Sequence, residues 1–304
     1  MITVLSGGVG AARLLRVLRG RLGGDELTAV VNVGDDFTLY GLTICPDLDT
    51  VTYTLAGRVD ALQGWGQRDE SWTVRDGLVA LGDDAWFRLG DRDLATHLYR
   101  SRRLGEGATK TAVSDEIARA LGVDVRVLPA TDDPVATTLT TSAGVLSFQD
   151  YFVRHRHAVA VSGIDYAGAD RARPGPDVVA AIARADRVVL APSNPLLSLA
   201  PIFAVPGVRG ALAARQGPCV AVSPLVGGRA LKGPADRLLG ELGHAPATEG
   251  VAEIFGDLVD TWVIDEADAS DAARLRARGF EVRVTTTVMG DPEREASLAT
   301  AVLA

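Results

Sequence analysis

The first 33 residues constrain the fold more than any other part of the chain. Residues 2–5 form a short apolar run, which Ser6-Gly7-Gly8-Val9-Gly10 interrupts, and residues 11–21 then carry leucines at helical spacing. A second apolar run follows at residues 27–33. The order strand, glycine loop, helix and strand predicts a βαβ unit, whose parallel strands are buried on both faces.

The remainder of the chain predicts how this unit is extended. Residues 51–107 read as helices that carry Trp65, Trp72 and Trp86, and residues 123–128, 135–139 and 144–161 alternate as strands do. After Pro176 helical and strand patterns alternate again, ending in a helix over residues 291–303. We predict one α/β domain over residues 1–304, with a doubly wound, mostly parallel, Rossmann-like sheet and an α+β insertion around residues 51–166.

Four carboxylates, Asp35, Asp36, Asp47 and Asp49, follow the second apolar run within a short span. Carboxylates at the end of a buried strand are unfavourable unless they meet cations or hydrogen-bond donors. A solvated acidic loop is one explanation, and a capping role for Asp49 at a helix that begins near Thr50 is another. The third is a Mg²⁺ site, because Mg²⁺ takes one or two carboxylates together with substrate phosphates.

Three loops are candidates for substrate contacts. The backbone N–H groups of residues 6–10 could hold a diphosphate at a helix N-terminus, although a tight turn that needs glycine explains the loop equally well. The loop matches neither the dinucleotide fingerprint nor a Walker A loop. Arg92, in the segment 89–97, could hold an anionic oxygen or serve in a local ion pair. Ser193 and Asn194 follow a predicted strand, where they form either a polar turn or a base-recognition loop.

Composition excludes some classes of protein. A formal net charge of -8 disfavours a nucleic-acid binder. No apolar stretch approaches the roughly 18 residues of a membrane span, and the N-terminus lacks the pattern of a signal peptide. Cys45 and Cys219 lie far apart, without metal-ligand spacing. These features predict a cytoplasmic protein that acts on small molecules.

Six segments in one order resemble the 2-phospho-L-lactate transferase family of coenzyme F420 biosynthesis, and within it the actinobacterial branch named for phosphoenolpyruvyl transfer. The resemblance covers nearly the whole chain. The segments are SGGVGAARLL, VVNVGDD, ICPDLDT, GWGQRDESW, LGDRDLATH and LAPSNP.

The resemblance implies a Mg²⁺-dependent transferase. It would move a phosphoenolpyruvyl or 2-phospholactyl group from a guanosine-diphosphate-linked donor to the ribityl hydroxyl of the deazaflavin Fo, with release of GMP. Family members also suggest a homodimer. The residues that match the family's functional positions are Gly7, Gly8 and Gly10 for the diphosphate, Ser193 and Asn194 for guanosine, Asp35 and Asp49 for the metal, and Asp49 with Arg92 for Fo or the transferred group.

Two other classes of function stay open at this stage. A non-catalytic nucleotide or deazaflavin binding protein would share the glycine loop but would not need the carboxylates. An NAD-type oxidoreductase would use a similar sheet, although the spacing of its glycine loop differs. The residues also leave open whether the acid is phosphoenolpyruvate, phospholactate or phosphoglycerate.

Overall fold

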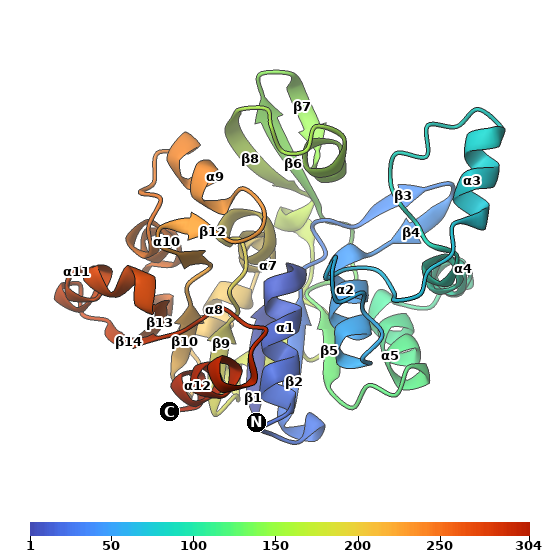
Figure 1. Ribbon diagram of the computed structural model, residues 1–304. Coiled ribbons are helices and arrows are strands. Elements are labelled where there is room, and N and C mark those ends of the chain that lie inside the picture. Colours follow the sequence, from blue (N-terminus) through green and yellow to red (C-terminus); the bar gives the residue numbers. More distant parts are fainter.

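The computed structural model describes residues 1–304 and is built around one seven-stranded sheet (Figure 1). The strand order is β14-β13-β10-β9-β1-β2-β5, and every neighbouring pair is parallel. This confirms the predicted doubly wound α/β sheet. The strands are β1 (Ile2–Ser6), β2 (Leu27–Val31), β5 (Arg126–Pro129), β9 (Arg187–Leu190), β10 (Cys219–Val222), β13 (Thr261–Asp265) and β14 (Glu281–Thr285).

Helices cover the two faces of this sheet. Crossovers between parallel strands are right-handed, so a chain that reverses its direction across the sheet places its later helices on the opposite face. Consistent with this rule, α1 packs against α2 and α12 (Figure 1), whereas α6 packs against α8. The helices are α1 (Gly8–Arg19), α2 (Pro46–Leu55), α3 (Thr73–Ala80), α4 (Asp91–Gly105), α5 (Lys110–Ala120), α6 (Val178–Ala183), α7 (Ala200–Ala204), α8 (Val208–Ala213), α9 (Ala235–Glu241), α10 (Thr248–Phe255), α11 (Ala272–Ala277) and α12 (Pro292–Leu303). None of the helices is both long enough and apolar enough to span a bilayer.

Smaller antiparallel elements project from the main sheet (Figure 1). Strand β5 lies within residues 51–166, the range of the predicted insertion, and yet it pairs with β2. This range therefore contributes a strand to the central sheet as well as smaller elements outside it. The smaller antiparallel elements are the hairpin of β3 (Phe37–Leu39) and β4 (Leu42–Ile44), the sheet of β6 (Ala136–Thr141), β7 (Gly144–Ser147) and β8 (Val161–Ala167), and the pair β11 (Leu225–Val226) and β12 (Arg229–Ala230).

The strand predicted over residues 144–161 is wrong in its middle part. The structure instead has one π-helical turn at Asp150–Arg154 between β7 and β8. Its Tyr151 is fully buried in a small apolar cluster with Leu139 and Leu238. Packing of this side chain under the three-stranded sheet therefore decides the local structure, because alternating apolar residues alone fit either a strand or a turn.

The chain changes direction across the sheet between β1 and β9. It leaves β1 towards β2, and it leaves β9 towards β10 on the other side. Loops that diverge from neighbouring strands in this way open a crevice at the carboxyl ends of the strands, which is where open α/β sheets bind ligands. The glycine loop after β1 and the loop Ala191–Asn194 after β9 border this switch point.

Candidate functional site

The glycine loop connects β1 to α1 with little room on two sides. A Cβ atom on Gly7 would lie 2.7 Å from Oδ2 of Asp47, and a Cβ on Gly10 would lie 2.5 Å from the carbonyl oxygen of Pro192. Gly8 differs, because its φ is +74° and a Cβ there would meet nothing within 4 Å. The loop therefore needs glycine for close packing at two positions, and at Gly8 it faces open space.

The loop after β9 contacts the glycine loop directly. The hydroxyl of Ser193 donates to the carbonyl oxygen of Gly7 at 2.8 Å, and the N–H of Gly7 lies 3.4 Å from the same hydroxyl. The side-chain oxygen of Asn194 accepts from the N–H groups of Leu196 and Leu197, both at 3.0 Å. The structure thus brings together the predicted diphosphate and guanosine residues, with Asn194 in part occupied as a helix cap.

Asp47 lies on the first turn of α2 and contacts the glycine loop. Its Oδ1 accepts from the N–H of Gly8 at 2.8 Å, and its Oδ2 accepts from the Asn32 amide at 3.0 Å. Burial raises the pKa of Asp47 to about 6, although these two donors act against the rise. The sequence pattern assigns no definite role to Asp47, and the only signal for Asn32 is its place directly after β2.

Asp35 lies close enough to Asp47 for the two charges to interact. Its side chain is buried, and its Oδ1 has no hydrogen-bond partner. Burial, and then the charge of Asp47, raises the pKa of Asp35 well above its ordinary value. The adjacent Asp36 is neutralised differently, because Nζ of Lys110 lies 2.6 Å from its Oδ2. Asp35 and Asp47 are therefore two buried carboxylates without a cation, a donor set that suits a divalent metal ion.

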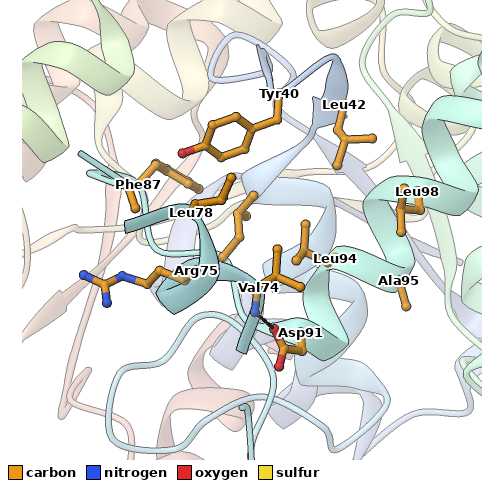
Figure 2. A pocket seen from close by; sticks show the side chains of 12 residues that line it. Tyr40, Leu42, Val74, Arg75, Leu78, Phe87, Asp91, Leu94, Ala95 and Leu98 are labelled. Carbon is orange, nitrogen blue, oxygen red and sulfur yellow. Dashed lines mark hydrogen bonds between the residues drawn. The ribbon is translucent and has the colours of Figure 1, made fainter. Parts of the chain in front are cut away.

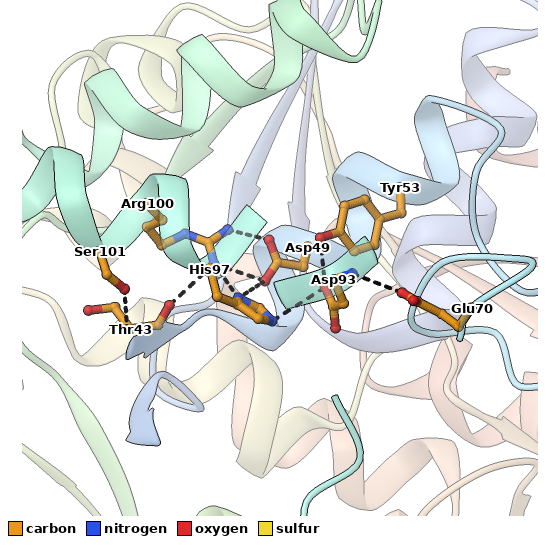
Figure 3. Close-up of polar contacts among 8 residues, drawn as sticks. All are labelled: Thr43, Asp49, Tyr53, Glu70, Asp93, His97, Arg100 and Ser101. Atoms are coloured by element: carbon orange, nitrogen blue, oxygen red, sulfur yellow. Dashed lines mark hydrogen bonds and ion pairs between the residues drawn. The ribbon is translucent and has the colours of Figure 1, made fainter. Parts of the chain in front are cut away.

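Asp49 leaves α2 on the side opposite to Asp47. There its side chain contacts residues of α4 (Figure 3). Nη1 of Arg100 lies 3.1 Å from its Oδ2, and Nη2 of Arg100 pairs with its Oδ1. Possible ligand atoms of Asp49, Asp93 and His97 lie within 4.8 Å of one another, and Asp35 is not part of this group. The guanidinium of Arg100 already occupies both oxygens of Asp49, so a metal ion here would face a fixed positive charge.

Arg92 lies on the first turn of α4 with its side chain exposed. Its backbone N–H donates to Glu70 at 2.8 Å, and Nη1 donates to the carbonyl oxygen of Arg68 at 3.1 Å. This carbonyl oxygen takes only one donor of the guanidinium, so further donors remain for an anion. Its role towards Fo stays a prediction.

An apolar cavity of about 410 Å³ lies on the other side of α4 (Figure 2). Leu94 and Leu98 of α4 line it, whereas His97 and Arg100 of the same helix face α2. One helix therefore separates the cavity from the Asp49 cluster. None of Trp65, Trp72 and Trp86 lines it. The other lining side chains include Tyr40, Leu42, Val74, Leu78, Ala85 and Phe87.

Two alanine substitutions in the glycine loop are expected to act differently. Gly7→Ala pushes a Cβ into Asp47 and into Ser198 Cβ at 2.8 Å, so we expect it to cost about 2 kcal/mol, or roughly 4 °C in melting temperature. It should also abolish the stabilisation that Mg²⁺ would give by binding Asp47. Gly8→Ala meets no atom but strains a left-handed residue, at a cost of about 1 kcal/mol. Thermal unfolding with and without Mg²⁺ distinguishes them, and equal Mg²⁺ responses would contradict this account of the loop.

A family model for "2-phospho-L-lactate transferase CofD" matches residues 2–303 of the chain. Proteins named phosphoenolpyruvate transferase are similar along their whole length. The protein from Kitasatospora aureofaciens is 43% identical and is matched over 100% of this chain and 97% of its own. The proteins from Thermobifida fusca and Mycolicibacterium smegmatis are 42% and 41% identical, each over 98% of this chain and over 95% and 96% of their own.

Solved structures agree with the fold. A crystal structure of a UPF0052 family member from Bacillus halodurans superimposes with a TM-score of 0.69, at 16% sequence identity, over 100% of this chain and 98% of that one. A second structure of a protein from this organism gives a TM-score of 0.67 at 18% identity, over 100% and 99% of the two chains. At this level of identity the likeness concerns the fold alone.

Proposed function

We propose that this chain, which belongs to the 2-phospho-L-lactate transferase CofD family, transfers a phosphoenolpyruvyl group to the ribityl hydroxyl of the deazaflavin Fo in coenzyme F420 biosynthesis. The donor is guanosine-diphosphate-linked, and GMP is released. The name shared by the relatives favours phosphoenolpyruvate as the acid, and the family's own name keeps 2-phospholactate as the alternative. The observation that carries the proposal is that Asp35 and Asp47, two interacting buried carboxylates, have no cationic partner and that Asp47 contacts the glycine loop at the switch point.

Mg²⁺ is the cofactor of this proposal. The buried, unpartnered Oδ1 of Asp35 and the neighbouring charge of Asp47 fit a divalent cation that keeps positions for phosphate oxygens. When bound, Mg²⁺ would neutralise charge on the diphosphate as the phosphorus–oxygen bond to GMP breaks. We assign to Asp47 the metal-binding role that the family resemblance implies for Asp49, because both oxygens of Asp49 pair with Arg100.

The chain's own residues would mainly bind and orient the substrates. Attack by the Fo hydroxyl on the phosphorus next to the acid needs in-line positioning and charge stabilisation more than covalent catalysis. The open side of Gly8, at the positive end of α1, suits the diphosphate, and Ser193 borders the place for guanosine. Arg92 offers a directed cation to the transferred group. Asp49 would act through its pair with Arg100.

The resemblance to the family also supports a homodimer as the working form. Sedimentation of the purified chain would check the dimer independently of any activity.

Both cysteines are free and buried, which favours the cytoplasm as the compartment.

A donor competition assay tests the proposed function. The protein is incubated with Fo, Mg²⁺ and equal amounts of the guanylylated phosphoenolpyruvate, phospholactate and phosphoglycerate donors, and GMP and the phosphodiester products are measured by mass spectrometry. We expect GMP and mainly the phosphoenolpyruvyl product, with no product in EDTA. Absence of product from every donor would refute the transferase. Tight binding of Fo without turnover would then favour the non-catalytic binding protein.

A further inference from the structure

The first turn of α2 is held from two sides. Asp47 and Asp49 are two residues apart, so their side chains leave the helix about 200° from each other. Asp47 contacts the N–H of Gly8, and Asp49 contacts Arg100 on α4. Any rotation or shift of this turn therefore moves both carboxylates together.

Arg100 is a buried arginine whose two terminal nitrogens make several contacts, whereas its Nε has no hydrogen-bond partner. Its side chain is 2% exposed, and it pairs with both oxygens of Asp49. Nη1 also lies 3.1 Å from Nδ1 of His97 and 3.5 Å from the carbonyl oxygen of Thr43. A guanidinium can only donate, so Nδ1 of His97 is the acceptor in this contact, and Nε2 of the same ring lies 3.3 Å from Asp93.

The support for Arg100 is itself anchored at several points (Figure 3). The hydroxyl of Tyr53, at the other end of α2, donates to Asp93 at 2.7 Å. Ser101 accepts from the N–H of Thr43 at 2.7 Å, which fixes α4 to β4. Glu70 accepts from the N–H of Asp93 at 2.9 Å. Helix α4 is thus fixed to three other segments, and Arg100 extends from it to the turn that carries Asp47.

A buried ion pair of this kind is weak evidence for stability, because desolvation of the two charges offsets their attraction. A bidentate pair does, however, fix direction and distance more strictly than apolar contacts do. We propose that Arg100 is a positioning residue, which holds the first turn of α2 so that the Asp47 carboxylate stays beside Gly8 and Asp35. This inference rests on the proposed function, in which Asp35 and Asp47 hold the divalent cation.

The expected effect falls on metal affinity. Groups that orient a metal-binding side chain typically contribute about 10- to 100-fold in affinity. Arg100→Lys keeps the charge and most of the volume but loses the fork that contacts both oxygens of Asp49. We expect it to raise the dissociation constant for Mn²⁺, used as a probe for Mg²⁺, by about 10-fold or more.

The test measures Mn²⁺ binding to the full chain without substrates, by titration calorimetry and by electron paramagnetic resonance. The matched control is Arg103→Lys, on the same helix, whose guanidinium pairs with Glu116 and Glu106 at the surface. The control should bind Mn²⁺ as the wild type does. In an Asp47→Asn background, Arg100→Lys should have no further effect on Mn²⁺ binding, because the residue that it orients is gone.

A second variant covers the case in which Arg100→Lys fails to fold. The double substitution Asp49→Leu with Arg100→Met replaces the ion pair by apolar side chains, a change that buried pairs often tolerate. It should also weaken Mn²⁺ binding. Wild-type affinity for Mn²⁺ in both variants would overturn the proposal. Tighter Mn²⁺ binding in Arg100→Lys would overturn it too, because that result means that Asp49 becomes a metal ligand once Arg100 no longer holds it. Mn²⁺ binding without GMP formation in the wild type would refute the transferase and leave the positioning role standing.

Discussion

Asp35→Asn is expected to raise the melting temperature of the metal-free protein and to lower its turnover by at least about 100-fold. The substitution removes a buried charge whose Oδ1 has no partner and which lies near the charge of Asp47. Removing such a charge stabilises the folded protein by about 1–2 kcal/mol, which raises the melting temperature of a domain of this size by roughly 2–4 °C. In the proposed function Asp35 is a ligand of Mg²⁺, and its loss would remove charge stabilisation of about 3 kcal/mol or more in the transition state, which corresponds to the expected fall in rate.

Asp36→Asn is the matched control for this prediction. Asp36 is the next residue in the chain and its side chain is 11% exposed, but its carboxylate pairs with Lys110. The substitution leaves the buried ammonium of Lys110 without its ion-pair partner, so we expect a loss of about 3 kcal/mol of stability. Melting curves in EDTA and initial rates with Mg²⁺ measure both variants. A lower melting temperature for Asp35→Asn would show that Asp35 is not an uncompensated charge.

The central sheet could be predicted because buried parallel strands leave a simple signal. All five residues of β2 are buried, and the run is apolar or β-branched throughout. The loop after β1 is predictable too, because glycines between a strand and a helix favour a turn, and Gly8 has a positive φ, which glycine adopts readily. These features depend on short stretches of chain, and local sequence is sufficient to specify them.

The roles of the two aspartates in the DLDT segment could not be read in the same way. In an extended segment Asp47 and Asp49 would share a face, whereas in the structure Pro46 begins α2 and separates them around a helix. Proline at the first position of a helix was the available signal. The partner of Asp49 is Arg100, which lies 51 residues further along the chain. Only the packing of α4 against α2 brings the two together.

Binding of Mg²⁺ is expected to weaken as the pH falls through about 6, because burial raises the pKa of Asp47 to about 6. For a carboxyl whose pKa is higher in the folded state, the native protein binds more protons than the unfolded chain. Stability of the metal-free protein therefore falls as the pH rises from about 4 to 6, by roughly 3 kcal/mol for a shift of about two pKa units. The raised pKa of Asp35 acts in the same direction.

The melting temperature with excess Mg²⁺, minus that in EDTA, isolates this effect between about pH 5 and pH 8. Asp91 and Glu116, whose pKa values hydrogen bonds lower to about 2, titrate below this range and do not interfere. We expect the difference to approach zero at the acidic end and to reach several degrees at the alkaline end, where a bound cation compensates both carboxylates. Asp35→Asn should remove most of the difference at every pH. A Mg²⁺ effect that is constant across the range, or largest in acid, would exclude Asp47 from the metal site.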